Sequence, residues 1–172
     1  MTATGDGAHL VVMGVAGSGK TTVAALLADR LGLELAEADD FHPAANVEKM
    51  HAGIPLTDED RAPWLLAIRD WLDGHSGGGR HAVVTCSALK RAYRDVLRTA
   101  QSPVRFVHLD GSRELLAARL AARKGHFMPP SLLASQLETL EPLDPDEDGF
   151  TVGIEAEPEE IADEIVERLS RP

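Results

Sequence analysis

Residues 14–21 read Gly-Val-Ala-Gly-Ser-Gly-Lys-Thr, which matches the phosphate-loop pattern G-x-x-x-x-G-K-[ST]. The apolar run at 10–13 predicts a strand before this loop, and residues 21–31 predict a helix after it, which Gly32 can terminate. Glycines let the backbone turn so that successive N–H groups point at phosphate oxygens, and the start of the helix adds a partial positive charge. The segment therefore predicts a nucleotide-phosphate site.

The phosphate loop supplies the first candidate site residues. In this motif the lysine, here Lys20, reaches the β- and γ-phosphates, and the hydroxyl of the last residue, here Thr21, ligates Mg²⁺. We expect the nucleotide to contact the whole loop and the first turn of the helix, namely Gly14, Val15, Ala16, Gly17, Ser18, Gly19, Lys20, Thr21 and Thr22.

The composition bounds the architecture. With 172 residues, of which 44% are hydrophobic, the chain can build one well-buried core, so we expect a single domain over residues 1–172. The lone cysteine, Cys86, excludes an internal disulfide, and no apolar stretch approaches the roughly 20 residues that cross a bilayer. Residues 1–9 lack the basic start and apolar core of a signal peptide, so we expect a loose tail and a cytoplasmic location.

The charge is uneven along the chain. The net charge is −11, and residues 125–172 hold 13 acidic side chains against two basic ones, whereas residues 1–124 hold 15 of each. Nucleic acids and anionic membranes require basic surface, so neither is an expected partner.

Strand and helix patterns alternate, which predicts a three-layer α/β/α fold with a mostly parallel sheet of about five strands. A polar stretch at 42–61 and a glycine-rich connector at 75–79 carry no assigned element. The expected strands are 10–13, 33–36, 82–86, 104–109 and 150–154, and the expected helices are 21–31, about 63–72, 90–100, 112–123, 131–140 and 158–169.

Three carboxylates, Glu37, Asp39 and Asp40, follow the second expected strand. Ligands of parallel sheets bind at the carboxyl ends of strands, so these side chains are candidates for the site. Asp110, after the strand at 104–109, is either a rival metal-site residue or a cap of the next helix. The chain has no Asn-Lys-x-Asp segment of the kind that reads guanine, so motor ATPases and small-molecule kinases remain.

Three further segments resemble the gluconokinase family of bacteria and eukaryotes. With the phosphate loop, they cover most of residues 10–143 in the order that the family shows. The first segment spans 39–65 and contains Asp39-Asp40-Phe41-His42-Pro43, the second spans 86–95 and begins Cys86-Ser87-Ala88-Leu89-Lys90, and the third spans 125–137 and begins Gly125-His126-Phe127-Met128-Pro129.

This resemblance implies a phosphate-loop kinase with a shikimate-kinase-like or nucleoside-monophosphate-kinase-like fold. It also implies a substrate-binding segment at about 39–64 and a lid at about 123–130. The implied reaction is transfer of a phosphoryl group from ATP, with Mg²⁺, to D-gluconate, giving ADP and 6-phosphogluconate, and the implied assembly is a homodimer. Two alternatives stay open: a kinase of the same fold for shikimate or another small polyol acid, and a non-catalytic nucleotide-binding regulatory protein.

The chain departs from the family in two places. When His42-Pro43 sets the alignment, many relatives have Asp-Gly-Asp where this chain has Glu37-Ala38-Asp39. The division of roles among Glu37, Asp39 and Asp40 is therefore open. Ala16 and Thr21 replace commoner serines, although threonine keeps the hydroxyl that Mg²⁺ needs.

Phosphoryl transfer depends on alignment and on neutralisation of the equatorial oxygens, so it needs positive charge and one carboxylate. We expect Lys20, with Arg119 and Arg123 one helical turn apart, to supply the charge. Asp39 is expected to hold the C6 hydroxyl and take its proton, and Glu37 or Asp40 to position Mg²⁺ through water.

The carboxylate of gluconate calls for a fixed cation, and its hydroxyls call for polar side chains. The expected cations are Lys49, Arg61, Lys90, Arg91 and Arg94. His42 and Asn46 suit the hydroxyls, and His126 in the expected lid suits a phosphate. Cys86 ends a strand without an activating pattern, so we expect a packed residue and not a nucleophile.

Overall fold

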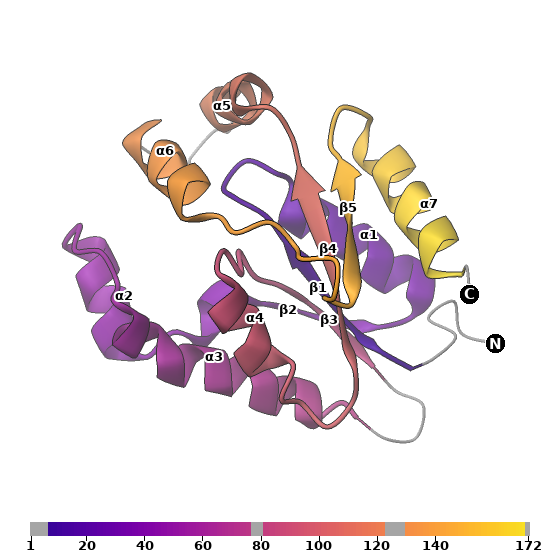
Figure 1. Ribbon diagram of the computed structural model, residues 1–172, viewed down its shortest axis with the longest axis horizontal. Coiled ribbons are helices and arrows are strands. Elements are labelled where there is room, and N and C mark those ends of the chain that lie inside the picture. Colours follow the sequence, from indigo (N-terminus) through magenta and orange to yellow (C-terminus); the bar gives the residue numbers. More distant parts are fainter. Residues whose placement is uncertain (1–6, 77–80, 123–129, 171–172) are drawn as a thin grey trace.

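The computed structural model describes residues 7–76, 81–122 and 130–170. Its centre is a sheet with the strand order β2-β3-β1-β4-β5, in which every neighbouring pair is parallel (Figure 1). This confirms the expected α/β fold with a parallel sheet of five strands. The strands are β1 (His9–Met13), β2 (Glu34–Glu37), β3 (Ala82–Thr85), β4 (Val104–Asp110) and β5 (Gly149–Gly153).

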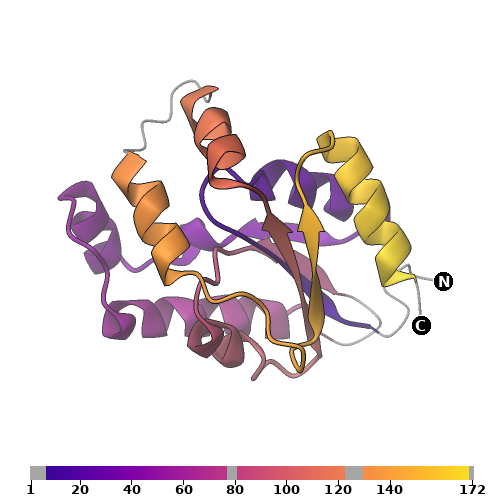
Figure 2. The same ribbon diagram turned by 45° about the horizontal axis from the view of Figure 1, so that its top comes forward.

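Helices connect successive strands, as parallel pairing requires. Figure 2 shows α1 and α7 together on one side of the sheet and α3 and α4 on the other, with α5 and α6 beyond the ends of the strands. The helices are α1 (Lys20–Leu31), α2 (Ala44–His51), α3 (Asp58–Asp73), α4 (Arg91–Leu97), α5 (Arg113–Ala122), α6 (Pro130–Thr139) and α7 (Pro158–Leu169), with a 3₁₀ turn, η1 (Ala38–Phe41). No helix of the described residues is long and apolar enough to span a bilayer.

The strand β1 lies between two hydrophobic cores. Leu10 and Val12 pack in the core under α1 and α7, whereas Val11 and Met13 pack in the core under α3 and α4. All four side chains are completely buried. Burial on both faces explains why this strand is a continuous apolar run and not an alternating one.

The region 42–61 differs from the sequence-based expectation, because it contains α2 and the first turn of α3. Helix α3 begins at Asp58 and not near Pro63. Its start is fixed by a capping box, in which Asp60 N donates to Thr57 Oγ1 at 3.1 Å and Thr57 N donates to Asp60 Oδ2 at 2.9 Å. Pro63 lies inside the helix, where it removes one backbone donor without ending it.

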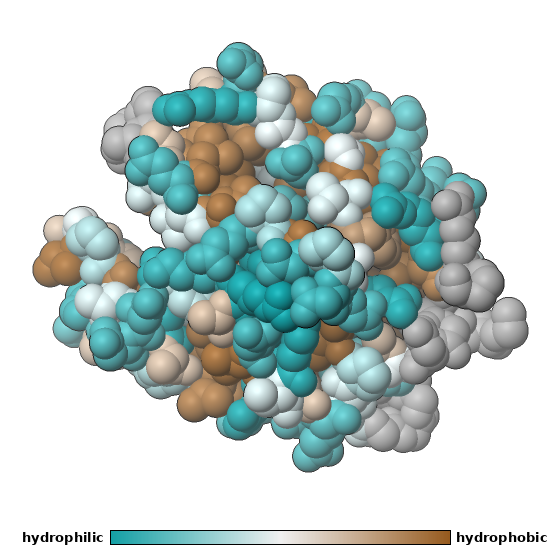
Figure 3. All heavy atoms as spheres, viewed as in Figure 1, coloured by the Kyte–Doolittle hydropathy of each residue, from teal (hydrophilic) through white to brown (hydrophobic). Residues whose placement is uncertain are grey.

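The acidic loop 141–148 is attached to α4 by a buried ion pair. Arg94 and Glu147 have fully buried side chains, with Nε to Oε1 at 2.7 Å and Nη2 to Oε2 at 3.0 Å. Burial alone would raise the pKa of Glu147, but hydrogen bonds from Arg94, Asp144 N and Arg98 lower it to about 2. Figure 3 shows hydrophilic side chains gathered over α4 and this loop.

Candidate active site

The phosphate loop connects β1 to α1 and lies against α5 and the end of β4. At Gly17 φ is +87°, and a Cβ there would lie 2.9 Å from both Leu116 O and Leu120 Cγ. A Cβ at Gly14 would lie 2.6 Å from Ser18 Oγ and 2.8 Å from Leu109 O. Both positions therefore require glycine, and the loop has a fixed shape.

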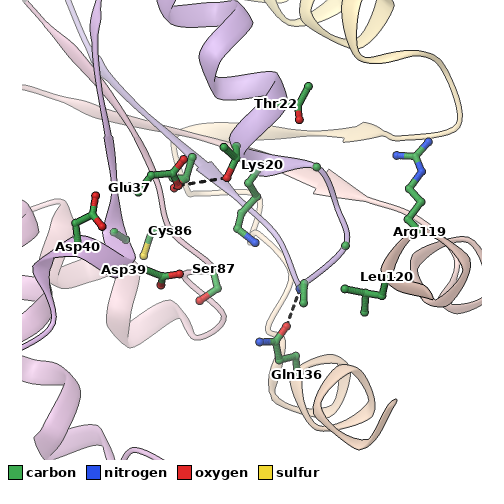
Figure 4. Close-up of a pocket in the computed structure, with 16 residues that line it drawn as sticks. Lys20, Thr22, Glu37, Asp39, Asp40, Cys86, Ser87, Arg119, Leu120 and Gln136 are labelled. Carbon is green, nitrogen blue, oxygen red and sulfur yellow. Dashed lines mark hydrogen bonds between the residues drawn. The ribbon is translucent and has the colours of Figure 1, made fainter. Parts of the chain in front are cut away.

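A cavity of about 1030 Å³ opens beside this loop. One wall is the loop with the first turn of α1, and the opposite wall is η1 with the end of β3 (Figure 4). The lining residues are Ala16, Gly17, Gly19, Lys20, Thr21, Thr22, Glu37, Ala38, Asp39, Asp40, Thr85, Cys86, Ser87, Arg119, Leu120 and Gln136. The remaining loop residues that we expected at the nucleotide, Gly14, Val15 and Ser18, are not part of this lining.

The start of α1 carries the positive charge of the site. No acidic side chain occupies its first turn, so the positive end of the helix dipole is not neutralised there. Lys20 Nζ is folded back over the loop, at 3.0 Å from Gly14 O and 3.3 Å from Val15 O. Thr21 and Thr22 are exposed on the same turn. This wall of the cavity suits an anionic ligand.

Oxygen atoms from three elements meet at Glu37. Its Oε2 accepts hydrogen bonds from Thr21 Oγ1, at 3.3 Å, and from Thr85 Oγ1. A carboxylate and hydroxyls are ligands that suit Mg²⁺. Among the residues that the structure describes, no three His, Cys, Asp or Glu side chains are grouped closely enough to hold a metal. An ion here would therefore take further oxygens from phosphates or water.

The carboxylates Asp39 and Asp40 lie on η1, across the cavity from the loop. Both are exposed. Figure 4 shows the Asp39 carboxylate directed toward Ser87 and the middle of the cavity, and that of Asp40 farther from Lys20. The turn is held in place because Trp64 Nε1 donates to Ala38 O at 2.7 Å. Asp39 is thus better placed than Asp40 to meet a group bound at Lys20.

The predicted substrate residues of α2, α3 and the start of α4 form a polar cluster next to η1. They do not line the cavity itself. Lys49 Nζ and Asp60 Oδ2 are 2.8 Å apart, and Lys90 Nζ and Asp58 Oδ1 are 3.3 Å apart. Arg61 Nη1 instead donates to Leu56 O at 3.1 Å and to Tyr93 Oη at 3.0 Å.

His42 and Asn46 connect this cluster to η1. The His42 ring stacks on Trp64, with centroids 4.4 Å apart. Asn46 Nδ2 lies 3.2 Å from His42 Nδ1 and donates to Asp60 O at 2.9 Å. Burial lowers the pKa of His42, the charge of Asp39 opposes this shift, and the charge of Arg61 adds to it. The negative charge of Asp39 on η1 and the positive charge of Arg61 on α3 therefore act on the pKa of His42 in opposite directions.

Two of the predicted substrate residues form ion pairs with the acidic loop 141–148 instead. Arg94 is fully buried against Glu147 and donates to Ala88 O at 2.8 Å. Arg91 donates to Asp144 and Asp146, both at 2.8 Å. Their guanidinium groups are paired with the loop and neither residue lines the cavity, so we do not include them in the acceptor site proposed below.

The other expected residues separate into three groups. Arg119 lines the cavity, and its Nη2 donates to Ile154 O. Asp110 does not line it, and Ser112 caps α5, with Leu115 N to Ser112 Oγ at 3.1 Å. Arg123 and His126, with nearly all of the predicted lid at 123–130, lie outside the described residues.

Cys86 lines the cavity but is buried, and burial raises the pKa of its thiol to about 12. A thiol that stays protonated at neutral pH is not a nucleophile.

Sequence reasoning missed Thr85 and Gln136. Thr85 could have been predicted, because its hydroxyl lies near the carboxyl end of the strand expected at 82–86, and the carboxylates expected at the site also follow a strand. Ala16 N donates to Gln136 Oε1 at 2.7 Å, which joins residues 120 positions apart in the chain. No local sequence pattern indicates that Ala16 and Gln136 are in contact.

A phosphate loop facing a carboxylate across a cavity, at the carboxyl end of a parallel sheet, is the arrangement of a small-molecule kinase. The family model described as AAA domain matches residues 10–143. Shikimate kinase from Aquifex aeolicus, at 20% identity, shares the fold with a TM-score of 0.58 over 94% of this chain and 95% of its own. The chain therefore has the α/β fold of the phosphate-loop kinases.

More similar proteins narrow this class. A gluconokinase from Gluconobacter oxydans is 55% identical over 91% of this chain and 88% of its own. The structure of a gluconokinase from Sinorhizobium meliloti is 46% identical and covers 96% of this chain and 93% of its own, with a TM-score of 0.87. A sugar kinase from a Janibacter species is 52% identical, also with a TM-score of 0.87, over 93% of this chain and 92% of its own. The chain therefore belongs to the gluconokinase family.

Proposed function

We propose that this protein transfers the γ-phosphoryl group of ATP to the C6 hydroxyl of D-gluconate, with ADP and 6-phospho-D-gluconate as products. The observation that carries the proposal is that Lys20, Thr21 and Asp39 line one cavity. Membership of the gluconokinase family supports gluconate as the acceptor, and favours it over shikimate and over a purely regulatory role.

In the proposed reaction, the C6 oxygen attacks the γ-phosphorus, and the bond from that phosphorus to the bridging oxygen of ADP breaks. The proton of the hydroxyl passes to the Asp39 carboxylate. The loop amides and Lys20 hold the phosphates, and Arg119 adds positive charge from α5. Alignment of the two substrates on opposite walls of the cavity supplies most of the catalysis.

Mg²⁺ is part of this proposal. Thr21 and Glu37 would hold the ion, and Asp40 would reach it through water. Bound there, the ion would neutralise charge on the β- and γ-phosphates. The oxygen atoms that meet at Glu37 support this placement.

For the acceptor we propose the segment at about 39–64 together with Lys90. His42 and Asn46 suit the sugar hydroxyls, because both are neutral side chains in a fixed geometry. Lys49 and Lys90 are already paired with Asp60 and Asp58. Arg61 has no carboxylate within ion-pair distance in the described chain, so it is our choice for the gluconate carboxylate.

A coupled assay of ADP release across a panel of sugar acids tests the function. We expect turnover with D-gluconate, and loss of that turnover in Lys20→Ala with unchanged circular dichroism. Near-normal turnover of Lys20→Ala, or no activity on gluconate, would overturn the assignment. The resemblance also leads us to propose a cytoplasmic location, a role in carbohydrate metabolism and a homodimer, the last of which light scattering tests.

A further inference from the structure

Gln136 of α6 reaches the phosphate loop and has no role in the mechanism described above. Its Oε1 accepts the amide hydrogen of Ala16 at 2.7 Å, and its side chain lines the cavity. In a phosphate loop, successive backbone N–H groups surround the phosphate oxygens. A side-chain oxygen at this position is therefore in the immediate neighbourhood of the bound phosphates.

The position of Gln136 is fixed by its helix. Leu133 is buried in the core, and Leu137 and Leu140 pack against the same core. Residues three and four apart share one face of a helix, so Gln136 lies on the core-facing side of α6, where it is partly buried. The end of the helix is tied down as well, since Glu141 N donates to Leu89 O at 2.6 Å. The position of the helix and the hydrogen bond to Ala16 therefore hold the amide group beside the loop.

The hydrogen bond to Ala16 also sets the orientation of the amide. A backbone N–H can donate only to the amide oxygen, so the Nε2 group must occupy the other side. Among the described residues none accepts a hydrogen bond from Nε2. Figure 4 shows this nitrogen turned away from the loop, toward the side of the cavity on which Ser87 lies. Two N–H donors thus face the cavity.

Lys20 and Gln136 converge on the same part of the loop. Lys20 Nζ contacts Gly14 O and Val15 O, and Gln136 contacts the next residue, Ala16. The lysine of this motif serves the β- and γ-phosphates. The transferred γ-phosphoryl group spreads its charge over three equatorial oxygens, each of which needs a donor or a cation.

We propose that Gln136 Nε2 donates a hydrogen bond to an oxygen of the γ-phosphoryl group, while Oε1 keeps the Ala16 amide in place. This inference rests on the proposed kinase function and assigns to it a γ-phosphate-binding residue. A contact to the γ-phosphate is made by ATP and is missing in ADP. Gln136 therefore contributes to the preference for ATP over ADP.

The test compares the affinity for a non-hydrolysable ATP analogue with that for ADP, by calorimetry on the whole protein without gluconate. Gln136→Glu keeps an oxygen for Ala16 but replaces the donor with a negatively charged acceptor. Because the variant loses a hydrogen bond to a charged group and gains a like charge, we expect the affinity for the analogue to fall by about 10-fold or more. The affinity for ADP should change by less than about 3-fold.

The matched control is Gln101→Glu. Gln101 is the other of the two glutamines in the chain and is exposed. It precedes β4, so it lies at the amino end of the parallel strands, opposite the end that carries the phosphate loop. The substitution adds the same charge, and both affinities should stay as in the unmodified protein. Gln136→Met, which has nearly the same length and no amide, provides a second variant should the glutamate variant fail to fold.

Equal losses of affinity for the analogue and for ADP would show that Gln136 only shapes the loop, and would overturn the proposal. Unchanged affinities for both would overturn it too. Because the readout does not involve gluconate, the proposed function can fail separately, through the absence of turnover in the unmodified protein.

Discussion

Glu37 and Thr85 lie opposite each other in the neighbouring parallel strands β2 and β3, and the Thr85 hydroxyl donates a hydrogen bond to Glu37 Oε2. The same oxygen accepts from Thr21 at the start of α1. Strand register therefore brings a carboxylate to the first turn of the phosphate-loop helix. This relationship is the physical basis for placing Mg²⁺ beside Thr21.

Glu37→Gln should weaken the binding of Mg²⁺ by about 10-fold or more, because it removes the only formal charge from this group of oxygens. Titration of Mn²⁺ by electron paramagnetic resonance in the presence of ADP measures the affinity directly, and the Mg²⁺ dependence of turnover should shift in parallel. Glu34→Gln is the matched control, since Glu34 lies in the same strand but is exposed and contacts His75. Equal effects of the two substitutions would contradict the metal site.

Asp39→Asn should lower kcat by about 100-fold or more, while the affinity for ATP stays nearly unchanged, because an amide cannot take the proton of the acceptor. Asp40→Asn should chiefly raise the Mg²⁺ requirement. Steady-state kinetics with nucleotide-binding measurements separate the two effects. Should Asp40→Asn abolish turnover and Asp39→Asn be mild, the roles of these two carboxylates are the reverse of our proposal.

Arg61→Gln should raise the KM for gluconate by about 10-fold or more and leave the KM for ATP unchanged, since it removes the cation proposed for the substrate carboxylate. Arg69→Gln is the control on the same helix, because Arg69 contacts Asp70 and Thr99 instead. An unchanged KM for gluconate in Arg61→Gln would exclude this residue from the acceptor site.

The strands β1, β3 and β4 and the phosphate loop could be predicted, because burial on both faces gives largely apolar runs and because the loop requires glycines at fixed positions. The sequence-based start of helix α3 near Pro63 is several residues too far along the chain, because proline is common in the first turn of a helix. The capping box of Thr57 and Asp60 marks the true start. The role of Arg94 could not be predicted, because its ion-pair partner, Glu147, lies 53 residues later in the chain. The contact between Gln136 and the phosphate loop likewise depends on how α6 packs, and no local sequence pattern indicates that packing.

Glu147→Gln should destabilise the protein by about 3–5 kcal/mol, because it leaves the guanidinium of Arg94 buried without its counter-charge. Urea unfolding measures this loss. Asp146→Asn is the control in the same loop, because its pair with Arg91 is exposed and its removal should change the stability little. Similar losses for the two variants would contradict the structural role of the buried pair.

His9 should make folding stability fall in mild acid. Burial, with the nearby His81, lowers the pKa of His9 from 6.5 to about 4. Its Nδ1 accepts the Ala82 amide at 3.1 Å, so the folded protein holds the neutral ring. Between about pH 6.5 and 4 the unfolded chain binds a proton that the folded chain does not, so stability decreases as the pH falls through this window.

His9→Gln should flatten that pH dependence, whereas His51→Gln, at an exposed position, should leave it unchanged. Thermal unfolding between pH 7 and pH 4 measures both slopes. A slope in His9→Gln as steep as in the unmodified protein would assign the acid sensitivity to other groups.

The hydrogen bond from Trp64 to Ala38 joins the middle of α3 to the turn that carries Asp39 and Asp40. Trp64 also forms the surface on which His42 stacks. One core side chain thus contacts both the turn that carries the two carboxylates and the imidazole that we propose for acceptor binding. A substitution at Trp64 would therefore disturb the positions of these side chains as well as the packing of the core.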